Sequence, residues 1–414
     1  MRKVVAIVVV AVLLASCGSG STSSSRTVTR GEGSAAGSGA LSVAARLASA
    51  SCVRRAEPAA NSPAVDTRIA FVSVPPRPFT AVTTVDKKWT FASLSGPPSR
   101  LAVMTPASFQ PRLVHLLNLP VAGVQGMALT PDGHHLLAAA GNGAAVLDVG
   151  RAEQGTAVLD ARLADPTVPS GTGGAIQVVP SPDGRYAFVT LESAGEIAVF
   201  DLRGALHGGD GFVGTIRLGT SPIGMAISPD GRWLYAASEV ARGLVPTAPA
   251  DGAVTVIDLR RAERDPAGSI VASASAGCAP LRLAVSADGR VVWVSARDSD
   301  AVLAFSANRL RTAPRQAALA AVRVGAAPVS VAPVDQGRRL IVADSDQFNV
   351  TDGTPGLAVI DPARALAGSS ALLGVIPSGR FPRELSVEPG GETVLVTNYG
   401  SGQIEAVAVK GLAG

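Results

Sequence analysis

The sequence is poor in the residues that most often carry out chemistry. Its 414 residues include three cysteines and four histidines, and charged residues make up only 16%. It has no His-Glu-x-x-His zinc motif, no Cys-x-x-Cys-His haem attachment, no Gly-x-Ser-x-Gly nucleophile elbow and no phosphate loop. The common metalloprotease, cytochrome, serine hydrolase and nucleotide-hydrolysing classes are therefore disfavoured, and we expect no cofactor.

Lysine is also scarce, and the formal net charge is only +4. Lysine occurs only at positions 3, 87, 88 and 410, so most of the positive charge comes from scattered arginines. No basic run is dense enough to indicate a nucleic-acid partner. Hydrophobic residues reach 47%, and 45 Gly with 29 Pro favour a large core with many turns over long helices.

The N-terminus has the pattern of a secretory signal. Arg2 and Lys3 precede an apolar run over residues 4–14, which is too short for a mature transmembrane helix. The run ends in Leu-Ala-Ser-Cys17, which resembles a bacterial lipobox. The resemblance implies that residues 1–16 are removed and that Cys17 carries the lipid, at about 0.8 kcal/mol per buried methylene. The alternative is an ordinary signal with an incidental cysteine.

Residues 17–65 form the predicted linker to the membrane. They are rich in Gly, Ser and Thr without apolar periodicity, so they cannot bury enough surface to fold. With Cys17 lipidated, Cys52 and Cys278 remain as an even pair in an oxidising compartment, and we expect a disulfide between them. Two unpaired thiols are the alternative.

A hairpin-like unit recurs over residues 66–411. It consists of a short apolar run, a turn usually centred on Asp-Gly, and a second apolar run. Seven copies, about 45 to 60 residues apart as expected for propeller blades, are centred near Asp86, Asp132, Asp183, Asp230, Asp288, Gly337 and Gly390.

Third and fourth apolar segments follow most copies, as in residues 196–202 and 214–218. The last copy stops after its third segment, residues 403–409. Residues 67–74 match the missing fourth segment, so the two ends of the chain should pair and close a ring. The predicted fold is an all-β, seven-bladed propeller of four-stranded blades.

The repeat SPDGRWLYAAS...GAVTVIDL, together with Val396-Thr397-Asn398, resembles the YVTN family of β-propeller repeats in bacterial and archaeal surface proteins. The resemblance covers residues 67–410 and is carried by turn and core positions. It implies the fold and a surface location rather than a chemistry. More distantly, the repeats are similar to those of lactonase-type seven-bladed propellers. Blades one and six depart from the pattern, with Asp86-Lys87 and Gln336-Gly337 at the turn.

The top face of such a propeller carries the crossings between blades and the loops after each second strand. We expect the residue two past each blade-starting proline, or its equivalent, to approach the channel mouth: Thr80, Gly126, Gln177, Gly224, Arg282, Ser330 and Glu384. Ligand-binding candidates are therefore Arg282, Arg383, Glu384 and Gln177, with Asn398, Tyr399, Arg297 and Asp344 on the rim. In the alternative interpretation, Arg282 and Glu384 pair with each other and close the channel.

A weak metal-site pattern lies in the loop over residues 344–353. Asp344, Asp346, Asn349 and Asp352 are oxygen donors of the kind that Ca²⁺ prefers, but they lack the EF-hand spacing, so a solvated loop is favoured. His134 and His135 follow a turn on the opposite, bottom face, where surface positions are expected rather than ligands.

Two functions follow from these features. The first is a monomeric binding or scaffold module, lipid-anchored to the cell membrane on its extracytoplasmic side, whose top face binds an envelope protein, a glycan or a small ligand. The second is a lactonase-type hydrolase that uses Glu384 and Arg282 at the channel mouth. The first is favoured because the mouth offers few converging acid–base groups.

Overall fold

The computed structural model of the chain describes residues 62–105, 109–241, 251–347 and 355–412. The predicted signal and Cys17 lie outside the described residues, as do all but the last residues of the predicted linker. The described residues all lie in one compact unit of the chain.

Seven four-stranded antiparallel sheets make up the fold. Blades one to three contain β2 (Pro78–Thr83), β3 (Thr90–Leu94), β4 (Arg100–Thr105) and β5 (Arg112–Asn118); β6 (Met127–Leu129), β7 (His135–Ala140), β8 (Gly143–Asp148) and β9 (Leu159–Ala164); and β10 (Ala175–Pro180), β11 (Tyr186–Leu191), β12 (Glu196–Asp201) and β13 (Phe212–Arg217). Each of these three blades uses four consecutive strands, as the repeats predict.

Blades four to seven follow the same plan. They contain β14 (Thr220–Ile227), β15 (Trp233–Val240), β16 (Ala253–Asp258) and β17 (Ile270–Ser275); β18 (Pro280–Val285), β19 (Val291–Ala296), β20 (Ala301–Ser306) and β21 (Ala318–Arg323); β22 (Pro328–Val334), β23 (Arg339–Asp344), β24 (Gly356–Ile360) and β25 (Leu372–Pro377); and β26 (Pro382–Val387), β27 (Thr393–Asn398) and β28 (Gln403–Ala408).

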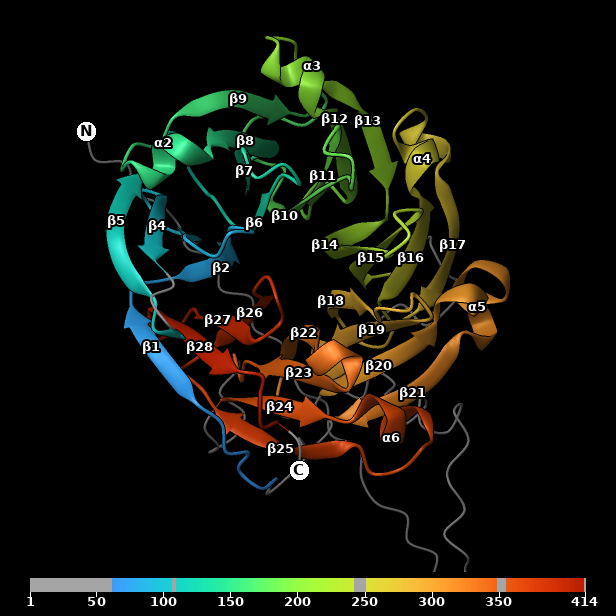
Figure 1. The fold of residues 1–414 in the computed structure, drawn as a ribbon. Helices are drawn as coiled ribbons and strands as arrows, with labels where there is room; N and C mark the ends of the chain where they lie inside the picture. Colours follow the sequence, from blue (N-terminus) through green and yellow to red (C-terminus); the bar gives the residue numbers. More distant parts are fainter. Residues whose placement is uncertain (1–61, 106–108, 242–250, 348–354, 413–414) are drawn as a thin grey trace, which may run out of the picture. The chain divides into compact units, whose positions relative to one another are not determined.

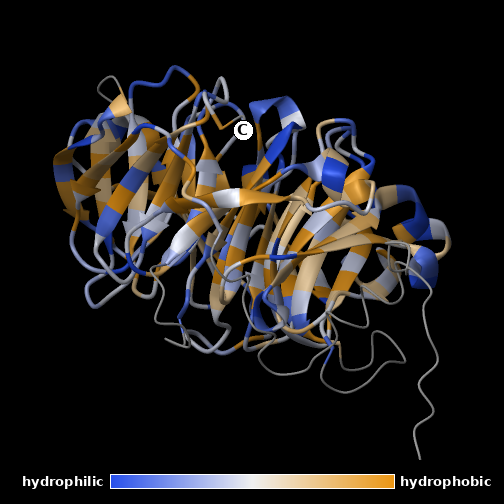
Figure 2. Cartoon of the chain, turned by 90° about the horizontal axis from the view of Figure 1, so that it is seen from below, coloured by the Kyte–Doolittle hydropathy of each residue, from blue (hydrophilic) through white to orange (hydrophobic). Residues whose placement is uncertain are grey.

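The first strand of each blade faces the centre of a ring (Figure 1). These inner strands contact one another in the order β2, β6, β10, β14, β18, β22 and β26, and β26 contacts β2. Side chains on the facing sheets interdigitate, and each hydrophobic cluster draws residues from neighbouring blades. In Figure 2 the apolar colour follows the strands, while the connecting loops are mostly polar.

The predicted closure of the ring is confirmed. β1 (Ile69–Ser73) pairs antiparallel with β28, from Ile69 opposite Val407 to Ser73 opposite Gln403, and the two lie side by side in Figure 1. Just before β1, Pro63 and Val65 bond to the backbone of Val375 on β25, the outer strand of blade six. The start of the described chain therefore touches two adjacent blades.

The Asp-Gly turns share one geometry. In blade four, the Asp230 carboxylate accepts from the Ser228 hydroxyl and the Arg232 amide, and Gly231 has a φ of +66°. That left-handed conformation costs glycine little. Blade one makes the same turn with Lys87 at a φ of 57°. Blade six differs, since Asp335 and Gln336 both have positive φ there.

Short helices follow the third strand in five blades, and the repeat pattern did not predict them. They are α2 (Val149–Glu153), α3 (Leu202–Leu206), α4 (Leu259–Ala262), α5 (Ala307–Thr312) and α6 (Pro362–Leu366). Each is capped by the side chain of the residue before it, an Asp in four cases and Ser306 before α5. Single-turn 3-10 helices occur at Pro266–Gly268, Arg297–Ser299, Pro314–Gln316 and Asp335–Gly337. Within the described ranges, none of the helices has the length and hydropathy needed to cross a membrane.

A β-bulge recurs where most inner strands begin. The register between the first two strands shifts by one residue just after Pro78, Ala175, Pro222, Pro280, Pro328 and Pro382. A bulge adds one unpaired residue to one strand and redirects its side chain. The bulges therefore decide which side chains reach the channel mouth.

Candidate functional site

A cavity of about 150 Å³ opens where five consecutive blades meet at the channel mouth. Its apolar lining consists of Ile176, Ile223, Leu281 and Val329, each in the bulge of its blade. Its polar lining consists of Glu192, Glu239, Arg282, Arg297, Gln347 and Arg383. Blades three to seven all contribute, so the cavity exists only in the assembled ring.

The prediction of which residues form the channel mouth was wrong by one position in most blades, because each bulge shifts the register. The cavity is lined mainly by the residue directly after each blade start, and of the seven positions predicted for the ring only Arg282 lines it. The predicted candidates Arg297 and Arg383 line it as well. The other positions support the channel wall instead. Gln177 accepts a hydrogen bond from the Met225 amide of the next blade, and the Ser330 hydroxyl accepts one from the Leu385 amide.

Arg282 and Glu384 form a buried ion pair across the channel. The Arg282 Nε and one Nη lie 3.0 and 2.9 Å from Glu384 Oε2. Their side chains are only 7% and 14% exposed. The alternative in which these residues pair with each other is therefore confirmed. A buried pair of this kind satisfies both charges, and losing one partner leaves the other uncompensated.

Arg297 is compensated by two carboxylates. It lies 3.0 Å from Glu239 and 2.8 Å from Asp298. Burial opposes its charge, but these two acids outweigh burial and raise the pKa of Arg297. Burial raises the pKa of Glu239 in turn, against the opposing charge of Arg297.

Arg383 stands apart from these pairs. It forms no ion pair with any residue that the structure describes, and its Nε is shielded from solvent without a hydrogen-bond acceptor. Its guanidinium carbon lies 4.0 Å from the centre of the Phe79 ring and 5.6 and 5.4 Å from those of Phe381 and Tyr399. Burial and the charge of Arg282 lower the pKa of Arg383 to about 10, so it is cationic at neutral pH.

Glu192 is a residue of the lining whose carboxylate forms no ion pair or hydrogen bond with the described residues. It follows β11 of blade three and is half-buried. Its charge acts on both Glu239 and Arg383, although it forms an ion pair with neither. The repeats do not single out Glu192, because only its position after a second strand marks it.

Asn398 and Tyr399, two residues predicted for the rim, have structural contacts instead. Asn398 is fully buried, and its amide donates to Glu405 Oε2 at 2.8 Å. It does not line the cavity, because it occupies the end of β27 beneath the crossing into blade seven. Tyr399 packs edgewise against Phe381, with ring centres 5.3 Å apart, and helps to hold Arg383.

Asp344 is buried rather than exposed on the rim. Its Oδ2 accepts from the Gly325 amide at 3.0 Å, and its Oδ1 has no hydrogen-bond partner in the part of the chain that the structure describes. Burial raises the pKa of Asp344 well above the usual range for aspartate, and the charge of Asp300 adds to the effect. The described residues contain no cluster of three or more potential metal ligands. Asn349 and Asp352 lie outside the described residues.

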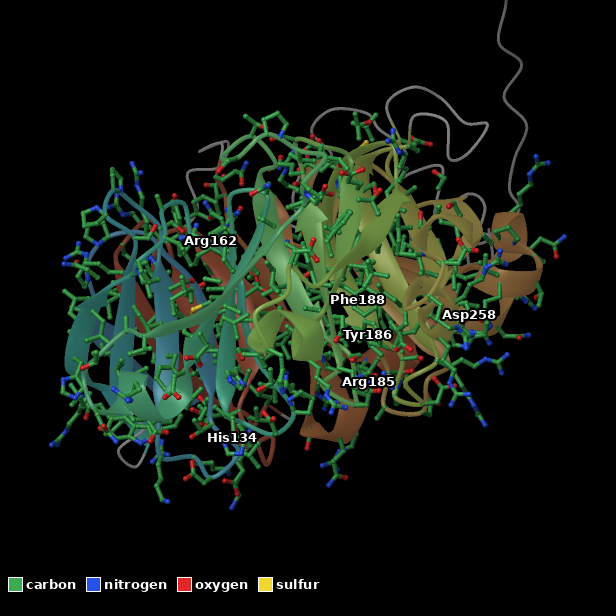
Figure 3. The ribbon with its side chains drawn as sticks, turned by 90° about the horizontal axis from the view of Figure 1, so that it is seen from above. His134, Arg162, Arg185, Tyr186, Phe188 and Asp258 are labelled. Atoms are coloured by element: carbon green, nitrogen blue, oxygen red, sulfur yellow. The ribbon has the colours of Figure 1, made fainter. Side chains whose placement is uncertain are left out.

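The histidines lie away from the cavity. His134 is exposed on a hairpin, and Figure 3 shows it at the same edge of the domain as Arg185, which occupies the matching hairpin of the next blade. His135 lies 3.5 Å from Asp160. Both positions agree with the expected surface role.

Cys278 is disulfide-bonded, in the crossing that leads into blade five. Cys17 and Cys52 lie outside the described residues. The pairing of Cys278 with Cys52 therefore stays a prediction.

Comparisons with known proteins agree with the fold. Residues 126–310 match the family described as "Lactonase, 7-bladed beta-propeller". The chain is a seven-bladed β-propeller. The match runs from the start of blade two into blade five, ends before β21, and so stops short of Arg383 and Glu384. A solved structure described as Kuenenia stuttgartiensis hydrazine synthase is similar at a TM-score of 0.62 and 15% identity, covering 86% of this chain and 99% of that one. At that identity the likeness shows the propeller fold alone. The chain matches no curated protein.

The buried Asp344 gives a test of the electrostatics. Because its pKa is raised in the folded state, its ionisation removes stability as pH rises above the unfolded value of about 3.9. We expect Asp344→Asn to raise the free energy of unfolding by on the order of 1 kcal/mol or more at pH 8, a gain that fades towards pH 4. Urea denaturation at several pH values measures this. Asp66→Asn, at an exposed position, is the control, and equal curves for Asp344→Asn and wild type would contradict the interpretation.

Proposed function

We propose that this chain is a lipid-anchored, extracytoplasmic binding protein that takes a small ligand at the channel mouth of its propeller. The observation that carries the proposal is the cavity in which five blades bring charged side chains together over an apolar floor. Concave sites of this kind, with a few polar groups among apolar ones, are the usual form of ligand sites. The sequence contains none of the catalytic motifs considered above that would favour a different site.

The size of the cavity limits the ligand. A volume of about 150 Å³ equals that of an engineered cavity known to hold benzene, and typical drug-sized sites are at least roughly twice as large. The cavity therefore suits a very small molecule or one end of a longer one. A glycan or protein of the envelope would place only a terminal group there.

The anchoring part of the proposal rests on the lipobox-like sequence before Cys17. If Cys17 carries the lipid, Cys17→Ser should move the full chain from the membrane fraction to the soluble fraction and abolish its labelling by a radioactive fatty acid. Cys52→Ser serves as the control, since that cysteine is not preceded by a lipobox. Unchanged labelling of the Cys17→Ser chain would contradict a lipoprotein.

Blocking the cavity tests the ligand site. Ile223→Phe adds volume to the cavity wall at a residue whose side chain makes no polar contact. We expect the purified full chain to release a small molecule on denaturation that the Ile223→Phe chain lacks, as detected by mass spectrometry. Val85→Phe, at a residue 77% exposed, is the control. Identical released molecules from all three proteins would argue against a site at the mouth.

A second candidate function is lactone hydrolysis, which the match of residues 126–310 favours. The geometry gives it less support, because Glu384 is held by Arg282 and Glu239 by Arg297. We therefore expect no hydrolysis of a lactone panel above the buffer rate, followed by pH-stat titration. Hydrolysis that is abolished by Glu384→Ala or Glu192→Gln in a folded protein would replace the binding proposal with an enzymatic one.

A further inference from the structure

We propose that the channel-mouth cavity takes a compact zwitterion, of which a small α-amino acid is the simplest example, with its carboxylate on Arg383 and its ammonium on Glu192. This inference rests on the ligand site proposed above and names the chemical class of its ligand. The argument depends on which charges around the cavity already have partners.

The other charges of the lining are compensated within the protein. Arg282 is paired with Glu384, and Arg297 is paired with Glu239 and Asp298. Among the described residues, this leaves one cation and one carboxylate on the cavity wall without an ion pair, Arg383 and Glu192. Arg383 is the buried one of the two, and a buried charge without a partner is costly, so such a residue is uncommon in a purely structural setting.

Arg383 occupies a position that is apolar in neighbouring blades. It is the residue after the blade-starting proline, where blades four, five and six have Ile223, Leu281 and Val329. Three aromatic rings surround its guanidinium and fix its plane. A guanidinium held in this way is suited to a carboxylate, which it can bind through two parallel hydrogen bonds. The ligand would also supply acceptors that the protein does not provide.

Glu192 faces the same cavity from a different blade. It comes from blade three and Arg383 from blade seven, and the charge of Glu192 acts on Arg383 although the two form no ion pair. The two charges are therefore separated by the cavity rather than joined across it. A simple anion would gain from Arg383 but would be repelled by Glu192. A molecule with both charges is attracted to both walls.

The dimensions agree with this class. Alanine has as many non-hydrogen atoms as benzene, which fills a cavity of roughly this volume. The apolar floor made by Ile223, Leu281 and Val329 can contact a short aliphatic side chain. Larger amino acids would have to leave their side chains outside the cavity.

Three probes isolate the contribution of each charge. L-alanine, L-lactate and propionate have the same carbon skeleton and carboxylate, and differ in carrying an ammonium, a hydroxyl or a hydrogen on one carbon. Calorimetric titration of the full chain should show alanine binding at least tenfold more tightly than propionate, with lactate between them.

Two variants assign the groups. Arg383→Leu introduces the residue type found at the matching position of blade five, so it should fold, and we expect it to weaken binding of all three probes at least tenfold. Glu192→Gln should reduce the preference for alanine over propionate to less than threefold. Arg380→Ala and Glu392→Gln, at exposed positions of blade seven, should change neither property.

The outcomes separate this inference from the proposed function. Equal binding of alanine and propionate to the wild type, alanine binding that survives Arg383→Leu, or no binding of any probe would each overturn the zwitterion proposal. If Ile223→Phe nevertheless loses a co-purifying molecule of another class, the ligand site stands and only its class is wrong. If no such molecule is lost either, both proposals fail.

Discussion

The backbone pairing of β1 with β28 is the constraint on which the rest of this structure depends. Five consecutive register pairs join the start of the propeller to its end. They complete the four-stranded sheet of blade seven and so close the ring. The blades are held mostly by apolar packing between sheets, which is strong but not directional. Hydrogen-bonded closure fixes the number of blades and thus the width of the channel. The cavity at its mouth inherits its dimensions from that closure.

Directional contacts near the centre then refine the alignment of blades. The Thr397 hydroxyl of blade seven donates to the Phe79 carbonyl of blade one, and the Thr190 hydroxyl of blade three donates to the Ile223 carbonyl of blade four. These bonds hold the residues that begin the inner strands. The Arg282–Glu384 ion pair is another directional contact, and it links blade five to blade seven across the channel. Charge compensation at the mouth is thus part of the scaffold, which makes Arg383 and Glu192 distinctive, since neither forms an ion pair with the residues that the structure describes.

The repeated turns and apolar runs were sufficient to predict the blades, their number and the closing strand, because these features depend on local turn geometry and strand periodicity. The lining of the cavity was not predictable in the same way. Because each bulge adds one residue to the inner strand, the cavity is lined by Ile223 and Val329 rather than by the predicted Gly224 and Ser330. Five of the six bulges directly follow the proline that begins the blade, but the proline alone does not tell which of the next residues turns towards the channel, because that depends on how neighbouring strands pair. Asn398 was misplaced for a similar reason, since its burial depends on Glu405 from the next strand.

The short contact of Pro63 and Val65 with β25 has a mechanical consequence. Pro63 and Val65 are themselves bonded to blade six by two backbone hydrogen bonds, each 2.9 Å long, before the chain reaches β1 on blade seven. Tension applied from the N-terminal side would therefore load these two hydrogen bonds before it loads the pairing of β1 with β28. The contact can peel away and re-form while the closing strand remains unloaded. A domain held at its N-terminus can in this way be pulled and turned without putting the ring itself at risk.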